Sequence, residues 1–519
     1  IGIKSDKHWM YLPPFNINVS PHSSFDNCFL GSCGSGKWAG IQGTFNHNDA
    51  GGFKFENNCT ISNAKIGVDI VMNGGSFEFS NVSFENCDAG IYIDGSFSNG
   101  PDKLAVSNCI FNNVKFGIKG TKYDKRFQIS STNTFTNCDL AISTEDVGGT
   151  TIKNQIISGG INGIKIDNPM VSTSPGIDLA GNNISVLNSA IFVNNVNKPT
   201  TLLFSNNILQ GSNKVRSTGI NIENSDMQNN IIISSSKPIA GFNYGVRINN
   251  VLHNSFFLSQ SNLFDNKHPI NYLNNTNSSY FRIIGGNWDF NGNSYIHDIQ
   301  NGGKIEDLNI SNSPIFITAS KDMFFNDNTF DWWNTPTGEN AILKLSNSSV
   351  SSFCCNTFNG QGNNLYLLGT NVNTKLRGST FINGSLTFDN TMIGLNEHAG
   401  NRWKESTTGR LIGGLPSDNQ FLVNYNESNS TLGDIKPSII EPSAIANEWF
   451  SDDGRESLGC YPGCGLPGNL PVNPDEDDVF LLPDTTNLVG NCYPLDLDTD
   501  GDGICDTSDP DAHDPCIPI

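Results

Sequence analysis

A run of closely spaced carboxylates near the end of the 519-residue chain is the segment best suited to chemistry. It reads DTDGDGICDTSD over residues 498–509, and Asp496 lies just before it. Oxygen ligands fall at positions 1, 3, 5, 9 and 12, and Gly503 at position 6 permits the sharp turn by which such a loop wraps around a hard cation. We therefore expect a calcium site formed by Asp496, Asp498, Asp500, Asp502, Asp506 and Asp509. The alternative is a solvated acidic linker without metal.

Residues for catalysis are sparse in the rest of the chain. The eight histidines are scattered, and no Ser or Cys nucleophile stands in a catalytic motif. A polysaccharide hydrolase would need paired carboxylates for acid and base, but the adjacent aspartates 452–453 and 477–478 lie late in the chain. Residues two places after successive glycines form one series that offers basic and acidic groups: Asp69, Tyr92, Lys119, Lys165, Asp178, Asn221 and Arg247. Lys165 and Asp178 are possible neighbours within it, although alternating charge is more typical of a solvated face.

Aromatic residues suggest another kind of site. We expect Trp332, Trp333 and Tyr366 to be exposed, where their rings can stack on sugars. The alternative for the tryptophan pair, beside Pro336, is a loop folded against the body of the protein.

A repeated unit of roughly two dozen residues recurs along the first half of the chain. Its clearest copy is FEFSNVSFENCDAGIYI, residues 77–93. Each unit holds three short alternating apolar runs separated by Asn, Gly or Asp, which is typical of three strands bent around a triangular coil. Phe53, Phe77, Leu104 and Phe127 hold equivalent places, so we expect them to align in one inward stack.

These features predict an all-β chain folded as a right-handed parallel β-helix with about three strands per coil. Asn at the bends tolerates left-handed backbone and can bond to its neighbour one coil away. Leucine-rich repeats and propellers fit less well, because the first consensus is missing and propeller blades are about 40 residues long. We expect an N-terminal cap in residues 1–40, the β-helix in 41–395, a C-terminal cap and exit region in 396–457, and a Cys/Pro/Asp-rich tail in 458–519.

Eleven of the 13 cysteines fall into two groups. One group lies in irregular segments and is expected to form disulfides in an oxidising compartment, with connectivity left open: Cys28, Cys33, Cys460, Cys464, Cys492, Cys505 and Cys516. A reduced protein with scattered thiols is the alternative. The second group falls at inward or bend positions of the repeat and predicts a stacked column of small buried thiols: Cys59, Cys87, Cys109 and Cys138.

The chain is strongly acidic, with a formal net charge of −21. Such a charge repels nucleic acid and anionic membrane surfaces, so we expect cations as partners, with no nucleic acid and no membrane insertion. No stretch approaches the roughly 18 apolar residues that span a bilayer, and Ile1 opens no signal peptide. We expect the chain to be a mature segment of a secreted precursor.

Three parts of the chain resemble a known group of proteins. The run CGSGKWAGI (residues 33–41), the repeat units and HAGNRW (398–403) are similar to large β-helix surface proteins exported by the type IX secretion system of Bacteroidota. The tail resembles thrombospondin type 3 calcium repeats, since position 12 is Asp rather than the Glu of an EF-hand and no flanking helices are expected. This resemblance implies a secreted, cell-surface location.

The sequence thus leads to an expected function and one alternative. We expect a non-catalytic extracellular surface or adhesive structural protein, a homo-oligomer or surface assembly that forms a fibre, ring or appendage for attachment or capture of prey. The alternative is a carbohydrate-active β-helix protein, either a polysaccharide lyase or hydrolase or a module with glycan ligands.

Overall fold

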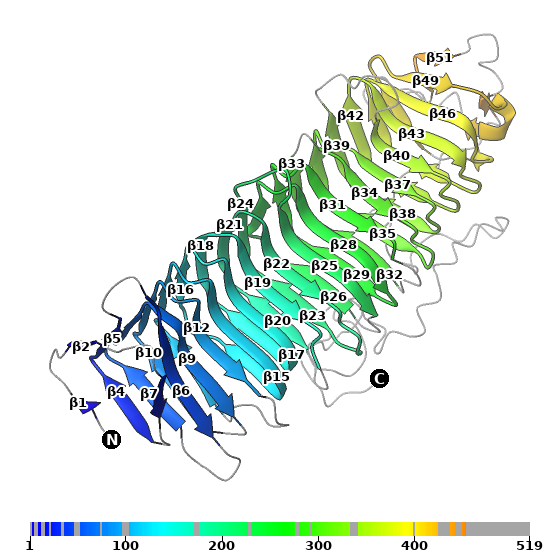
Figure 1. Ribbon diagram of the computed structural model, residues 1–519. Helices are drawn as coiled ribbons and strands as arrows, with labels where there is room; N and C mark the ends of the chain where they lie inside the picture. The colour runs from blue at the N-terminus through cyan, green and yellow to red at the C-terminus, as the bar shows by residue number, and fades with distance from the viewer. Residues whose placement is uncertain are drawn as a thin grey trace, which may run out of the picture. The chain divides into compact units, whose positions relative to one another are not determined.

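The protein is seen in a computed structural model that divides into two compact units, residues 1–460 and 461–519. The structure describes residues 3–4, 9–11, 16–19, 22–32, 36–45, 52–72, 75–95, 103–170, 176–226, 230–275, 280–289, 292–332, 341–397, 400–423, 436–441 and 449–452. These belong to the first unit, which Figure 1 shows as a stack of coils running from the blue strands to the yellow ones. The six aspartates of the predicted calcium site lie outside the described residues.

The first unit is built of strands arranged on three faces, which we call the short, long and second faces. One short 3-10 helix, η1 (Pro416–Asn419), interrupts the described strands near the end. The short face has strands of three to five residues: β2 (Trp9–Tyr11), β5 (Phe29–Gly31), β8 (Thr60–Ser62), β11 (Ser83–Glu85), β14 (Ile110–Asn112), β16 (Thr134–Thr136), β18 (Ile156–Gly160), β21 (Asn183–Val186), β24 (Ile208–Gly211), β27 (Pro238–Ala240), β30 (Asn262–Phe264), β33 (Asn287–Asp289), β36 (Asn309–Ser311), β39 (Thr329–Trp332), β42 (Thr357–Gly360), β45 (Thr380–Ile382) and β48 (Arg402–Lys404).

The long face follows the short face in each coil. Its strands are β3 (Asn16–Val19), β6 (Trp38–Phe45), β9 (Ala64–Met72), β12 (Ala89–Asp94), β15 (Phe116–Ile129), β17 (Leu140–Lys153), β19 (Asn162–Asp167), β22 (Ser189–Asn194), β25 (Thr218–Asp226), β28 (Tyr244–Leu252), β31 (His268–Leu273), β34 (Ser294–His297), β37 (Ile315–Thr318), β40 (Ala341–Ser346), β43 (Asn363–Thr370), β46 (Ser385–Met392), β49 (Thr408–Leu411) and β51 (Ile439–Glu441).

The second face completes each coil. It begins with β1 (Ile3–Lys4), β4 (Ser23–Asp26), β7 (Gly52–Glu56), β10 (Ser76–Ser80) and β13 (Lys103–Ser107). The 14-residue strands β15 and β17 then run from the long face into this one. It continues with β20 (Ile177–Ala180), β23 (Leu202–Ser205), β26 (Asn230–Ser234), β29 (Ser255–Ser259), β32 (Tyr280–Ile284), β35 (Gly303–Glu306), β38 (Met323–Asn326), β41 (Ser352–Cys354) and β44 (Lys375–Arg377).

Neighbouring coils pair in parallel, so equivalent residues lie one above another. On the short face Phe84 pairs with Phe111, and Phe111 pairs with Phe135. Partners in adjacent coils are separated by as few as 20 residues, at Ile310 and Phe330, and by as many as 31, at Leu30 and Ile61. The predicted right-handed parallel β-helix is therefore confirmed.

The core is a continuous apolar interior formed by the inward residues of all three faces. Phe53 pairs with Phe77 and Phe77 pairs with Leu104, which confirms this part of the predicted inward stack. Phe127 is buried in the following coil. On the short face the rings stack directly, with centroids 4.8 Å apart for Phe84 and Phe111. No single coil could bury these rings, so stability depends on the stacking of neighbours.

Asparagine forms many of the bends and also bonds between coils, as predicted. Asn81 and Asn108, for example, have φ values of 56° and 53°, which Asn tolerates better than most residues. At one buried corner, side-chain amides connect consecutive coils through Asn133, Gln155, Asn182 and Asn207. These amides satisfy backbone groups that would otherwise be unpaired in an apolar interior.

The four cysteines predicted to be buried are indeed buried, but they occupy two corners instead of one column. Cys59 and Cys109 precede short-face strands, with Val82 between them in the coil order, whereas Cys87 and Cys138 precede long-face strands. The thiols of Cys87, Cys109 and Cys138 each donate a hydrogen bond to backbone carbonyls. Burial raises the pKa of Cys87 and Cys138 to about 11 and that of Cys109 to about 12.

The described strands near both ends of the unit follow the same parallel pairing. Strand β5 pairs with β8 within residues 1–62, and β2 pairs with β5. Near the other end a three-stranded parallel sheet consists of β47 (Asn396–Glu397), β50 (Phe421–Val423) and β52 (Phe450–Asp452). Trp403 lies edge-on to Phe421 and Phe450, with centroids 6.1 and 5.6 Å away.

Candidate functional site

The long face carries one outward residue per coil at a fixed position, and this column contains most of the series predicted from the sequence. Asp69 pairs with Tyr92 and Tyr92 with Lys119; Ser143, Lys165, Phe192, Asn221 and Arg247 continue the register. Because each strand contributes the same position, the outward side chains lie about 4.8 Å apart along the stack. The long face therefore presents a linear array.

Asp178 does not belong to this column, so its assignment to the series is wrong, and the possible contact between Lys165 and Asp178 is not formed. Asp178 lies in β20 on the second face, between Thr151 and Leu203. Its carboxylate pairs with Lys153 at 2.6 Å, whereas Lys165 pairs with Asp167 at 3.2 Å. The Gly-Ile pattern marks the start of strands on more than one face, which explains the error.

Cations of the long-face column are paired with neighbouring carboxylates. Lys119 Nζ lies 3.5 Å from Glu145, and Arg247 lies 2.5 Å from Glu223. Lys119 also lies 5.9 Å from the ring centroid of Tyr92. Burial, and then the charge of Asp94, raise the pKa of the Asp69 carboxyl. Ion pairs between neighbouring coils are the arrangement expected of a solvated face that reinforces the stack.

Farther along the column, four successive coils present what we call the aromatic row: Tyr295, Phe316, Lys344 and Tyr366. The Tyr295 and Phe316 centroids are 5.4 Å apart, and Lys344 Nζ lies 4.7 Å from the centroid of Tyr366. Tyr295 and Phe316 are half-buried and remain available for contact. The sequence shows these residues, but only the register reveals that they are consecutive.

Tyr366 itself is only 1% exposed, so its predicted role as an exposed sugar-stacking ring is wrong. Lys344 lies over its ring, and its hydroxyl donates a hydrogen bond to Asp389. Trp332 is half-buried and packs against the core, in agreement with the alternative of a segment folded on the coil. Trp333 lies outside the described residues.

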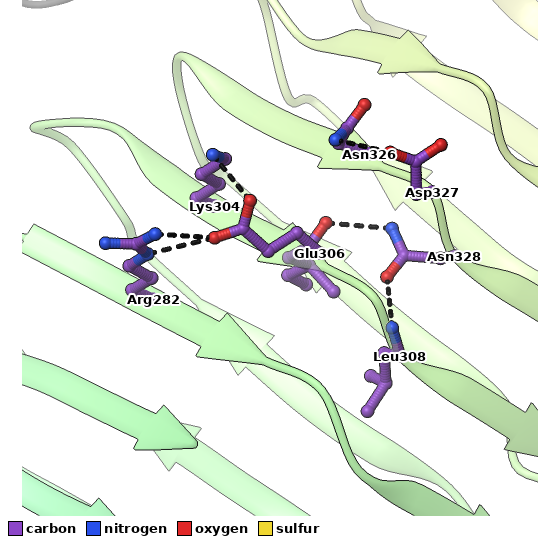
Figure 2. A network of polar contacts seen from close by, with 8 residues as sticks. Arg282, Lys304, Glu306, Leu308, Asn326, Asp327 and Asn328 are labelled. Atoms are coloured by element: carbon purple, nitrogen blue, oxygen red, sulfur yellow. Dashed lines mark hydrogen bonds and ion pairs between the residues drawn. The ribbon is translucent and has the colours of Figure 1, made fainter. Parts of the chain in front are cut away.

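The second face carries a compact ionic network on consecutive coils, shown in Figure 2. Arg282 from β32 donates to Glu306 Oε1 of β35 through Nε at 3.1 Å and Nη2 at 2.7 Å. Lys304, two residues before Glu306, contacts its other carboxylate oxygen at 2.5 Å. The side chains of Arg282 and Glu306 are 6% and 9% exposed, so the low local dielectric strengthens their attraction.

Two carboxylates stand at the bend beside this network. Asp307 and Asp327 occupy equivalent bends of adjacent coils, with φ values of 53° and 51°, and the Asp307 N–H donates to the carbonyl of Asn326. Desolvation raises the pKa of both carboxyls, and neighbouring negative charge, from Glu306 at Asp307 and from Asp307 at Asp327, raises it further. Asn326 Nδ2 donates to Asp327 at 2.9 Å.

The charged groups of this network are paired with one another, so they have little capacity to react with a substrate. Glu306 accepts from two cations, so it serves to neutralise them. The raised pKa of Asp307 and Asp327 is the property that a general acid needs, and it makes them the only carboxyl pair of this kind among the residues with a resolved shift. Within the described part of the chain, no group of three or more His, Cys, Asp or Glu side chains is placed to hold a metal ion.

Comparison of the chain with models of protein families, with curated proteins and with solved structures found no match. Among the described residues, no helix has the length and apolar character that a membrane span requires.

Proposed function

We propose that this chain is a non-catalytic extracellular surface protein whose stacked coils display a long face for adhesion or for lateral assembly with further copies. The observation that carries the proposal is the aromatic row, in which Tyr295, Phe316 and Lys344 of three successive coils are half-buried and Tyr366 lies beneath Lys344. A linear array of this kind suits a partner that also repeats along a line, such as a second copy of the β-helix or a polymer at a surface. Aromatic side chains are enriched in such interfaces.

The cross-coil ion pairs support a structural function. Lys119, Lys153 and Arg247 each have a carboxylate partner. A catalytic base would need to be available to a substrate proton instead. A rod in which every coil supports the next is well suited to a surface appendage.

The proposal extends to the tail and to location. We propose that the tail binds calcium through Asp496, Asp498, Asp500, Asp502, Asp506 and Asp509, in the manner of thrombospondin type 3 repeats, and that the protein reaches the cell surface through type IX secretion. The density of carboxylates in this segment supports calcium binding, because it is self-repelling without a cation. Calorimetric titration of the full chain with calcium should show binding that is lost in an Asp498→Asn, Asp502→Asn double variant. Equal binding by wild type and variant would contradict this assignment.

Electron microscopy of the purified full chain tests the assembly proposal. We expect ordered fibres or rings, and we expect Phe316→Ser to abolish them. Leu203→Ser is the matched control, because Leu203 is also an outward, half-buried apolar residue but lies on the second face. Single particles at every concentration, combined with no binding to cells or insoluble glycans, would refute the proposal.

A second candidate function, a carbohydrate-active protein, is favoured by the Asp307 and Asp327 pair alone. Incubation with acidic polysaccharides, with and without a chelator, tests it. Product formation that is lost in Asp307→Asn, or in Lys119→Ala, would establish turnover and overturn the non-catalytic assignment. Unchanged polysaccharide with the wild type and both variants would support the non-catalytic assignment.

A further inference from the structure

Cys28 and Cys59 differ from the other described short-face cysteine because their sulfur atoms meet. Cys28 directly precedes β5 and Cys59 directly precedes β8, and these two strands are parallel neighbours. The N–H of Thr60 donates to the carbonyl of Cys28 at 2.7 Å, so the two cysteines hold the same position on successive coils. Their Sγ atoms are 2.8 Å apart.

That separation is shorter than the roughly 3.5 to 4.0 Å at which nonbonded carbon atoms meet, although sulfur is larger than carbon. Equivalent residues of adjacent parallel strands have backbones about 4.8 Å apart. Disulfide-bonded cysteines usually have Cα atoms about 4.4 to 6.8 Å apart. The backbone thus holds Cys28 and Cys59 within the range that a disulfide requires.

The remaining described thiols at these corners provide the contrast. Val82 occupies the equivalent place between Cys59 and Cys109, and Val114 does so between Cys87 and Cys138. Cys109 therefore bonds to the carbonyls of Phe79 and Ser107. The valine in the intervening coil keeps the sulfur of Cys59 apart from that of Cys109, and the sulfur of Cys87 apart from that of Cys138. Cys28 and Cys59, in contrast, occur in consecutive coils.

The protonation of the pair also favours reaction. The hydrogen bond from the Cys28 thiol to Cys59 Sγ lowers the pKa of Cys59 and raises that of Cys28. A thiolate and not a thiol attacks a disulfide, so the lowered pKa of Cys59 favours oxidation of the pair. The Cys59 side chain is fully buried, whereas Cys28 is partly exposed.

We propose that Cys28 and Cys59 form a disulfide that staples the first coils of the β-helix together once the chain reaches an oxidising compartment. The oxidant is a disulfide, either of a small-molecule thiol or of a thiol oxidase. One S–S bond forms between Cys28 and Cys59 while the S–S bond of the oxidant breaks, and the two thiol protons and two electrons pass to the oxidant, which leaves as two thiols.

The staple has a structural purpose at this position. The terminal strands of a parallel stack have one unpaired edge, which can fray or recruit another chain. A cross-link between β5 and β8, the strands next to β2, holds these two coils together near that end, and it stabilises the fold because it restricts the unfolded segment between residues 28 and 59. This inference does not depend on the proposed adhesive function.

Peptide mapping of the full chain tests the inference directly. Protein equilibrated with oxidised and reduced glutathione is alkylated in denaturant, digested without reductant and analysed by mass spectrometry. We expect one cross-linked peptide pair that contains Cys28 and Cys59 and that disappears after reduction. In Cys109→Ser, the matched control, the same linkage should remain; in Cys59→Ser it should be lost and Cys28 should become alkylated.

Thermal unfolding of the wild type with and without reductant gives a second measurement that needs no variant. We expect a lower Tm in reductant, and a smaller difference in Cys59→Ser if that variant folds, because other cysteines of the chain are also expected to form disulfides. Recovery of both Cys28 and Cys59 as alkylated thiols from the oxidised wild type would overturn the inference. Linkage of Cys28 to any other cysteine, such as Cys33, would overturn it equally.

Discussion

Arg282 and Glu306 face each other across two adjacent coils, with Arg282 Nη2 2.7 Å from Glu306 Oε1 and both side chains more than 90% buried. Lys304 contacts the same carboxylate. A carboxylate between two cations is balanced only as long as all three remain, since removal of one partner from a buried pair leaves an uncompensated charge.

Replacement of Glu306 should therefore be costly. We expect Glu306→Ala to lower the free energy of unfolding by about 3 kcal/mol, measured by urea denaturation, because Arg282 and Lys304 lose their shared partner. Glu441→Ala is the matched control: it removes the exposed Arg410–Glu441 pair, whose side chains are 47% and 51% exposed, and should cost at most about 1 kcal/mol. Similar losses in both variants would show that burial of the network does not matter.

The ring stack of the short face should carry a large share of the stability. Phe111 lies between Phe84 and Phe135, with centroid distances of 4.8 and 4.6 Å, and is fully buried. We expect Phe111→Ala to cost about 3 to 5 kcal/mol, because it opens a cavity in the column. The neighbouring Ile110 points outward and is 47% exposed, so Ile110→Ala should change the unfolding free energy far less. Equal effects would contradict the assigned inward and outward positions.

The buried side-chain amides should contribute more to the free energy of unfolding than the exposed ones. Asn182 accepts from the N–H of Gln155 at 3.0 Å and donates to the carbonyl of Ile152 at 3.0 Å. We expect Asn182→Ala to cost about 1 to 3 kcal/mol, because the N–H of Gln155 and the carbonyl of Ile152 would each lose a buried hydrogen bond. Asn188 makes an exposed bond to Asn162 at 3.1 Å, so Asn188→Ala serves as the control and should be nearly neutral by chemical denaturation.

Asp327 should destabilise the fold at neutral pH. Partial burial and then the charge of Asp307 raise the pKa of its carboxyl, so the folded state favours the protonated form. The protonated Asp327 carboxyl contributes favourably to the free energy of unfolding at low pH, and this contribution is lost as the pH rises through the raised pKa. We expect Asp327→Asn to be more stable than wild type near pH 7, by no more than about 1 kcal/mol because the group is largely exposed.

The same variant should lose its advantage in acid. Near pH 3, below the ordinary carboxyl pKa of about 3.9, the aspartate is largely protonated and the difference in unfolding midpoint should shrink. Asn suits the left-handed backbone at this position, where φ is 51°. A destabilised Asp327→Asn protein at pH 7 would show that its charge is favourable and that the inferred repulsion is wrong.

The local pattern of the sequence was sufficient for the strands, the bends and the class of fold. Alternation of apolar and polar residues is set by backbone geometry, so Phe53 and Phe77 could be assigned to the interior without coordinates. Asn at the bends follows equally from local sterics, since few other residues adopt positive φ. Stacking was then required, because one coil cannot bury its own apolar residues.

Only the tertiary structure decided which residues are neighbours across coils. Coils differ by up to 11 residues in length, between the spacing of 31 at Leu30 and Ile61 and that of 20 at Ile310 and Phe330. Part of this difference lies in the strands themselves, because β6 and β7 have 8 and 5 residues whereas β37 and β38 have 4 each, and no fixed repeat length in the sequence records it. Asp178 was therefore assigned to the wrong face, and the contact between Cys28 and Cys59 could not be foreseen. The sequence by itself determines what each strand buries, whereas the length of each coil, resolved only in the folded stack, decides what the strand lies beside.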